Sequence, residues 1–130
     1  MYLPIDDDHP LRAGRPYGMS KRLSEEMCEA WTSRTGIPTT VLRPVCVLDD
    51  DRLATTDPRQ LEFGAFVHVV DVADAVVKAL EVPAAGHIRM ILCGPGEFDA
   101  SRANRELGWQ PSRGWPSRRK RLRAAWRRAG

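Results

Sequence analysis

The chain has 130 residues, of which 42% are hydrophobic, so it is long enough for one domain with a core and too apolar for disorder throughout. No apolar run approaches the roughly 20 residues that span a bilayer, and the acidic start, MYLPIDDDHP, lacks the apolar region of a secretory signal. We therefore expect a soluble, cytoplasmic protein rather than a membrane-spanning or secreted one.

The formal net charge of +3 is unevenly distributed along the chain. Residues 113–130 contain eight basic residues and no acidic one, whereas residues 1–112 contain 12 basic and 17 acidic residues. We predict an acidic body at 1–112 and a disordered basic tail at 113–130. Such a tail could bind nucleic acid through its charges and Trp126, or it could be a solvated extension, and we favour the extension.

The first predicted element is a helix over about residues 16–34, preceded by a loop at 4–16. Gly36 and Pro38 end this helix. Its large apolar residues recur every four positions and form one stripe, which consists of Met19, Leu23, Met27 and Trp31.

Three later segments have the continuous apolar, β-branched composition of buried strands. They are residues 39–48, 66–70 and 88–94, and a polar loop is expected at 49–62. A second helix follows directly after residue 70, where Asp71 is a good N-cap, and Pro83 follows its last turn. A short helix is predicted at about 101–107, with Gly108 after its end.

Alternating helices and buried strands indicate an α/β fold. Strands buried on both faces need neighbours on both edges, and three strands do not supply them. The first helix also has no preceding strand to pack beside. The sequence is therefore predicted to form the later part of a larger, Rossmann-like doubly wound parallel sheet with a small C-terminal α/β region.

Cysteines and histidines are scattered and give no metal-binding spacing, so we predict no metal site. Cys28, Cys46 and Cys93 are interpreted as small core residues in a reducing compartment.

Tyr17 and Lys21 lie four residues apart near the start of the first helix, so their side chains share one helix face. A free phenol ionises only near pH 10, and an adjacent ammonium favours the phenolate. Such a phenol can exchange a proton with a hydroxyl or carbonyl oxygen while hydride moves at the same carbon. The motif is short, however, and an ordinary surface Tyr/Lys pair is the alternative.

Four segments in order resemble the extended short-chain dehydrogenase/reductase family, also called the NAD-dependent epimerase/dehydratase family. They are DDDHPLRAGRPYGMSKRLSEE, TGIPTTVLRPVCV, FVHVVDVADAVVKALE and RANRELGWQP. Together they cover about residues 5–112, so the body is predicted to be a partial domain of this type.

The resemblance implies roles for several residues. Tyr17 would be the general acid/base, and Lys21 would favour its ionised form and hold the nicotinamide ribose of NAD or NADP. Pro44 would line the nicotinamide pocket, and Asp71 would be structural, as a helix cap. We expect Arg43 to be able to pair with an acid, His68 to be a packed strand residue, and Trp109 and Pro111 to dock against the body.

Important parts of the family pattern are absent. No glycine-rich GxxGxxG turn is present, and no serine or threonine precedes Tyr17 to orient a substrate carbonyl. We therefore expect an N-terminal nucleotide-binding half to be missing and the isolated chain to be inactive. The resemblance also implies a small-molecule substrate, a sugar or sugar nucleotide among the candidates, and a homodimer through the tyrosine helix. The alternative is a non-enzymatic α/β remnant whose basic tail binds nucleic acid.

Overall fold

The computed structural model describes residues 3–10, 14–82 and 84–115. The predicted basic tail, apart from its first residues, therefore lies outside the described residues, and its role stays a prediction. The elements in chain order are α1 (Pro16–Thr35), β1 (Thr39–Pro44), β2 (Val47–Leu48), α2 (Asp50–Thr55), η1 (Pro58–Gln60), η2 (Glu62–Gly64), β3 (Val67–His68), α3 (Val69–Glu81), β4 (His87–Leu92) and α4 (Ser101–Leu107).

Two parallel strand pairs form the sheet structure of the described chain. β1 pairs with β4 from Thr39↔His87 to Pro44↔Leu92, and the shorter β2 pairs with β3. Parallel pairing with helical crossovers is typical of α/β proteins. This confirms the predicted fold class.

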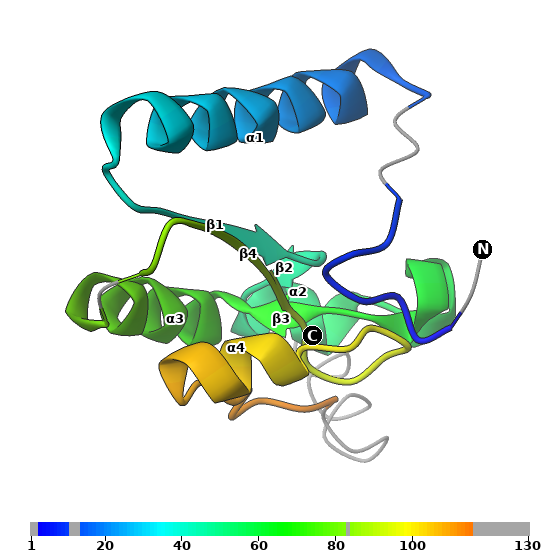
Figure 1. Cartoon of the computed structure of the whole chain (residues 1–130). Helices are drawn as coiled ribbons and strands as arrows, with labels where there is room; N and C mark the ends of the chain where they lie inside the picture. Colours follow the sequence, from blue (N-terminus) through cyan, green and yellow to red (C-terminus); the bar gives the residue numbers. More distant parts are fainter. Residues whose placement is uncertain (1–2, 11–13, 83, 116–130) are drawn as a thin grey trace.

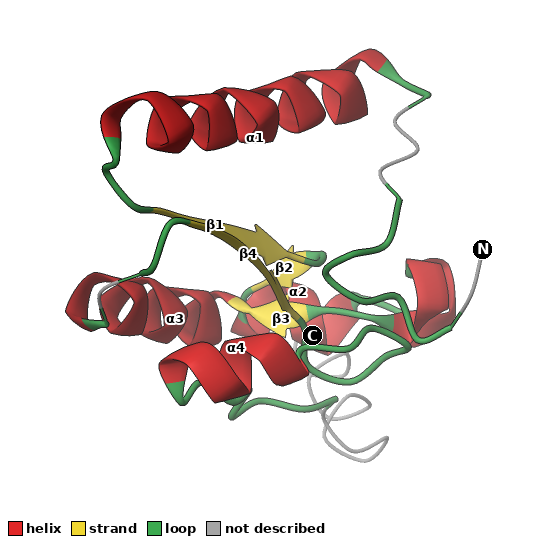
Figure 2. Cartoon of the chain, viewed as in Figure 1, coloured by secondary structure: helices red, strands yellow, loops and turns green. Residues whose placement is uncertain are grey.

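The β1–β4 pair lies between helices on its two faces (Figure 1). α3 and α4 lie below the sheet in that view and α1 lies above it, as the red helices of Figure 2 also show. The main core is on the α3/α4 side and consists of Val67, Ala75, Met90, Leu92, Ala103, Leu107 and Trp109. Trp109 is 1% exposed and donates its indole N–H to the Asp71 carbonyl oxygen at 2.8 Å, so the segment after α4 docks on the body as predicted.

Helix α1 has the predicted bounds within one residue, with proline in its first turn and Gly36 after its end at φ 72°. Its predicted apolar stripe, however, is exposed rather than packed. Met19, Leu23, Met27 and Trp31 are 53%, 55%, 72% and 46% exposed. Thr32 is the buried residue of this helix.

Several predicted boundaries were wrong. The single strand predicted at 39–48 is interrupted at residues 45–46 and divides between β1 and β2. The expected loop at 49–62 contains α2, whose start is capped by Asp49, and most of two short 3-10 helices. Asp–Asp–Asp at 49–51 supplies both the cap and acidic residues for the first turn, which favours a helix start.

Asp71 is not the N-cap of α3, which was also a wrong prediction. The N-cap is three residues earlier, because His68 ends β3 and its Nδ1 accepts the backbone N–H of Val70 at 3.2 Å. Asp71 lies in the first turn and accepts hydrogen bonds from the backbone N–H groups of Ser112 and Arg113, at 3.1 and 3.2 Å. Its role is structural, as expected, but it holds the segment that follows α4.

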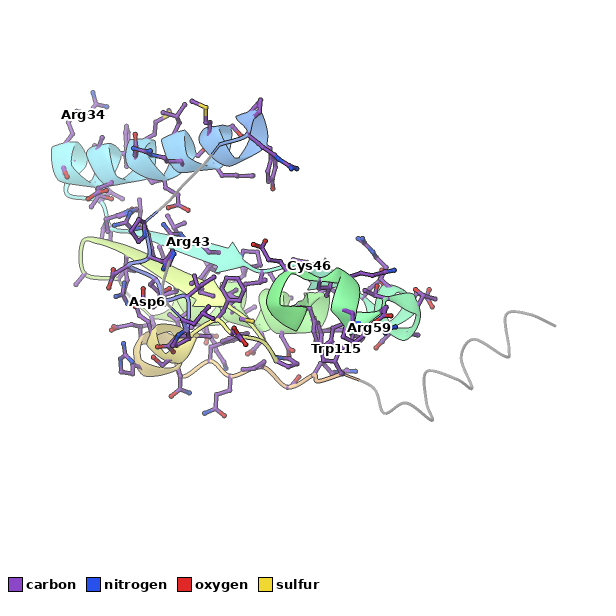
Figure 3. All side chains as sticks on the ribbon, turned by 90° about the vertical axis from the view of Figure 1, so that its right-hand side faces the viewer. Asp6, Arg34, Arg43, Cys46, Arg59 and Trp115 are labelled. Carbon is purple, nitrogen blue, oxygen red and sulfur yellow. The ribbon has the colours of Figure 1, made fainter. Side chains whose placement is uncertain are left out.

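The cysteines differ from one another. Cys93 is buried, and that burial raises the pKa of its thiol to about 11. Cys28 is only partly buried and Cys46 is exposed, so the prediction that all three are core residues was wrong. Cys46 lies at the interruption between β1 and β2, and Figure 3 labels it there.

Candidate active site

Tyr17 and Lys21 lie in the first two turns of α1, with their side chains on one helix face. The Lys21 ammonium is 5.4 Å from the centroid of the Tyr17 ring, within the range of a cation–π interaction. Tyr17 is 74% exposed, so its hydroxyl is open to a ligand. Ser20 donates its hydroxyl to the Tyr17 carbonyl oxygen at 2.8 Å and so does not compete for the phenol.

Pro44 is the last residue of β1 and is exposed. α1 runs back over the sheet, so its first turn and the C-terminal end of β1 lie at the same end of the molecule (Figure 1). Ligands of open α/β sheets bind beyond the C-terminal ends of the strands. The structure therefore places the three predicted site residues at the end of the fold where a ligand is expected.

The side of α1 that carries the Tyr/Lys pair can be assigned from its contacts. Glu25 and Thr32 face the sheet, since Glu25 pairs with Arg43 and the Thr32 hydroxyl lies 2.7 Å from that of Thr39. At about 100° per residue, Tyr17 and Lys21 lie on one flank of this sheet-facing line.

Arg22 and Glu26 lie on the other flank of α1, and together with Arg89 of β4 they line one cleft. That flank is therefore the one over β4. Tyr17 and Lys21 consequently face the opposite edge of β1, which has no strand neighbour among the described residues.

Arg43 holds α1 against the sheet. Its Nε donates to Glu25 Oε1 at 2.9 Å, its Nη2 donates to Glu25 Oε2, and its Nη1 donates to the Asp7 carbonyl oxygen at 3.0 Å. The side chains of Arg43 and Glu25 are 15% and 14% exposed. Figure 3 shows Arg43 on the side of β1 that faces α1. The expectation that Arg43 pairs with an acid is confirmed.

Asp7 is a second buried anchor on the same side of the sheet. Its Oδ1 accepts the backbone N–H of Ile91, and its Oδ2 is 3.6 Å from Nε of Arg102. Burial raises the pKa of the Asp7 carboxyl, while the Ile91 N–H and the charge of Arg102 act in the opposite direction. The neighbouring Asp8 is exposed, and its hydrogen bond from Arg102 lowers its pKa.

Sequence reasoning did not identify Asp7, Glu25 and Arg102 as members of this network. The only signal was the aspartate run before α1 together with an arginine inside a buried strand.

Among the described residues, no group of three or more His, Cys, Asp or Glu side chains is gathered as a metal site. No helix of the described chain is long and apolar enough to cross a membrane.

Comparison with known proteins supports the resemblance seen in the sequence. Residues 3–48 match the NAD dependent epimerase/dehydratase family. The protein named "Putative UDP-glucose 4-epimerase" from Methanocaldococcus jannaschii is 40% identical over 42 residues, which are 32% of this chain and 14% of that protein.

Solved structures similar to this chain include two sugar-acid dehydrogenases. Uronate dehydrogenase from Agrobacterium tumefaciens is 20% identical with a TM-score of 0.66, over 98% of this chain and 45% of the enzyme. Glucuronic acid dehydrogenase from Chromohalobacter salexigens is 21% identical with a TM-score of 0.66, over 96% of this chain and 46% of the enzyme. A mutant of the Agrobacterium enzyme with the same TM-score was solved with NAD.

The chain spans less than half the length of these solved structures and a smaller share of the archaeal relative. At these identities the solved structures show the fold alone. Residues 3–48 therefore match the NAD dependent epimerase/dehydratase family, and the described chain shares the α/β fold of part of these dehydrogenase structures.

Proposed function

We propose that this chain supplies the acid–base part of an NAD-dependent oxidoreductase or epimerase of the extended short-chain type. The observation that carries the proposal is the position of Tyr17 and Lys21, together on one face of α1 at the C-terminal end of β1. The segment matched by the family model, 3–48, includes both residues and Pro44.

Tyr17 would exchange a proton with a hydroxyl or carbonyl oxygen of the substrate. The Lys21 ammonium, on the same face, would favour the ionised phenol and donate hydrogen bonds to a ribose hydroxyl. A bound nicotinamide would accept or return hydride at the same substrate carbon. The exposed Tyr17 hydroxyl leaves space for the substrate oxygen beside it.

The described residues fit only the nicotinamide-ribose end of such a cofactor. The Gly–Pro–Gly turn at 94–96 is the nearest approach to a glycine-rich loop, and protein atoms already fill its space. A Cβ on Gly96 would lie 2.5 Å from the Ala65 Cβ, and one on Gly94 would lie 3.1 Å from the Phe66 carbonyl oxygen. This turn packs against the body and cannot cradle a pyrophosphate.

We propose that activity needs a nucleotide-binding half at the open edge of β1, in the same polypeptide or in another. Tyr17 and Lys21 face that edge, and the similar enzymes are more than twice as long as the matched part. The isolated chain is then expected to be inactive. The names of the similar proteins support a sugar or sugar nucleotide as the substrate, and the NAD complex of one of them supports NAD.

A nicotinamide riboside titration tests the half-site that the chain contains. The reduced riboside has the nicotinamide and ribose but no phosphate, so it does not need the missing cradle. We expect weak, saturable amide shifts in an NMR titration at the first turn of α1 and at Val45. The shifts should disappear in the double variant Tyr17→Phe/Lys21→Ala and persist in Lys78→Ala, which removes a lysine of α3.

Adenosine is the matched ligand control and should cause no shift at these positions. If both ligands, or neither, perturb the first turn of α1, the proposed role of the Tyr/Lys pair is wrong. Measurable turnover of any NAD(P)-linked substrate by the purified chain would contradict the expected inactivity.

We also propose that the outward-facing stripe of α1 pairs with the same stripe of a second copy. Soluble monomers rarely expose a large contiguous apolar patch, and Met19, Leu23, Met27 and Trp31 follow one another along the exposed side of α1. A two-fold axis would place the stripe against itself, which is the usual arrangement of a homodimer.

A further inference from the structure

A cleft lies beside α1 on the flank opposite the Tyr17–Lys21 pair. Its volume is about 430 Å³, within the range of small-molecule sites. α1 and the loop at 7–10 supply its walls, and β1 and β4 supply its floor. The charged residues that line it are three arginines, Arg22, Arg43 and Arg89, and three acids, Asp7, Asp8 and Glu26.

Each acid of the cleft already has a partner within the protein. Asp7 accepts the Ile91 N–H, and Asp8 Oδ2 accepts from Nη2 of Arg102 at 2.6 Å. Glu26 Oε1 accepts from Nε of Arg22 at 2.7 Å. None of these hydrogen bonds to the three acids comes from Arg89, which lies on β4 at the floor of the cleft.

The guanidinium groups of the three arginines differ in how many hydrogen-bond partners they have within the protein. Each of the three guanidinium nitrogens of Arg43 donates to Glu25 or to the Asp7 carbonyl oxygen, and Arg22 pairs with Glu26 on a half-exposed surface. Arg89 is partly buried in β4, and among the described residues its guanidinium has no hydrogen bond or ion pair. Its charge acts on Asp8 only as a longer-range Coulomb interaction.

A guanidinium that donates to no group among the described residues keeps its N–H donors available to a ligand. Its planar fork of N–H donors matches the oxygen atoms of a carboxylate or phosphate in two parallel hydrogen bonds. Because Arg89 opens into a cleft large enough for a small molecule, an anion from solution can reach it.

We propose that this cleft binds the phosphate or carboxylate group of a small polar molecule through Arg89, with Arg22 at the rim as a second donor. The remaining lone pairs of Asp8 Oδ1 and Glu26 Oε2 can accept hydrogen bonds from hydroxyl groups elsewhere on the ligand. This site is separate from the Tyr17–Lys21 pair, and its existence does not depend on the activity proposed for that pair.

An NMR titration of the full chain with inorganic phosphate, and separately with acetate, tests the site. Sodium chloride keeps the ionic strength constant, so that general screening does not contribute to the shifts. We expect saturable shifts of the Arg89 side-chain N–H and of the amides at Asp8, Arg22 and Glu26. The phosphate and acetate series then distinguish a tetrahedral from a planar anion as the preferred group.

Arg89→Met should weaken binding by at least about tenfold, the loss expected for a charge-assisted hydrogen bond pair. Arg89→Lys keeps the charge without the planar fork, so its affinity should fall between that of Arg89→Met and the unchanged chain. Arg34→Met is the matched control, because Arg34 is at the far end of α1 and stacks on Trp31 outside the cleft (Figure 3). It should bind as the unchanged chain does.

Two results would overturn the proposal. One is the absence of saturable shifts for either anion. The other is equal affinity in the Arg89→Met and Arg34→Met variants, which would mean that the anions meet surface arginines in general. If Arg89→Met does not fold, the Arg89→Lys comparison decides between these outcomes.

Discussion

The two faces of the β1–β4 pair are packed in different ways. On the α3/α4 face, Met90 and Leu92 are 1% and 0% exposed and belong to one apolar core with Trp109. On the α1 face, Glu25 pairs with Arg43, and Thr39 Oγ1 lies 2.7 Å from both the Thr32 hydroxyl and Nδ1 of His87.

The difference shows that apolar burial holds α3 and α4, whereas charge and hydrogen bonding hold α1. Apolar burial is non-directional and adds with area, but a buried ion pair gains stability only while both partners are present. The helix that carries the proposed chemistry is thus the one whose own apolar residues face away from the sheet. Substitutions on the two faces should therefore differ in how much they lower the free energy of unfolding and in how much of the chain they affect.

The largest effect is expected for Trp109→Ala on the α3/α4 face. Removing this buried indole should lower the free energy of unfolding by about 3–5 kcal/mol, since it leaves a cavity and removes the hydrogen bond to the Asp71 carbonyl. Urea denaturation followed by circular dichroism would measure this loss. Leu80→Ala, at a residue 83% exposed on α3, should cost less than about 0.5 kcal/mol. Similar losses for the two variants would mean that the core assignment is wrong.

Glu25→Ala should cost less, about 2–3 kcal/mol, since the pair with Arg43 is slightly exposed and fully buried pairs lose about 3–5. The effect should be local. Hydrogen exchange should accelerate at α1 amides and remain unchanged in α3.

The double variant Glu25→Ala/Arg43→Met should recover part of this loss, because it removes the unpaired charge. The exposed Glu29→Ala on the same helix is the control and should have little effect. Faster exchange throughout the chain after Glu25→Ala would show that α1 is not held separately.

A smaller effect is expected at Asp7. Asp7→Ala leaves the buried Ile91 N–H unpaired and should cost about 1–3 kcal/mol, whereas Asp7→Asn keeps the Oδ1 acceptor and should cost less. Burial raises the pKa of Asp7 in the folded state, so its ionisation opposes folding. The stability of the unchanged chain relative to Asp7→Asn should therefore fall as the pH rises from about 4 through the folded-state pKa.

Asp8→Asn is the matched control with the opposite sign. The Arg102 hydrogen bond lowers the pKa of Asp8, so its ionisation favours folding. The stability of the unchanged chain relative to Asp8→Asn should rise as the pH increases from the folded-state pKa to just above the ordinary value of about 4, and then level off. Denaturant titrations at several pH values would measure both trends. Equal slopes for the two variants would contradict the assigned environments.

Local signals in the sequence predicted much of the fold. Pro16 and Gly36 gave the bounds of α1, and Gly108 gave the end of α4. The start of α3 could not be predicted in the same way, because an imidazole nitrogen of His68 caps it rather than the carboxylate of Asp71. A histidine is a less common cap than an aspartate, so residue preference pointed to the wrong position.

The candidate site was predictable only in part. Tyr17 and Lys21 are one turn apart, so helical geometry alone brought them together. Glu25 and Arg43 are 18 residues apart on different elements, and Asp7 and Ile91 are 84 apart. No local periodicity connects such pairs. The spacing of the α1 stripe predicted one apolar face but could not indicate that this face points away from the sheet.

The smallest effect on stability, and the clearest on assembly, is expected on the exposed stripe of α1. Leu23→Glu/Met27→Glu should change the free energy of unfolding of one copy by no more than about 0.5 kcal/mol, because neither side chain packs against the sheet. If the stripe pairs with a second copy, light scattering should give a dimer mass for the unchanged chain and a monomer mass for the variant.

Val77→Glu, at a residue 53% exposed on α3, is the matched control and should leave the dimer intact. A monomer mass for the unchanged chain at high concentration would contradict the homodimer. A dimer lost through Val77→Glu would place the contact on the α3 face instead. Either result would show that the outward stripe of α1 is not the contact between two copies, and the polar attachment of α1 to the sheet would then be the contact that holds this helix.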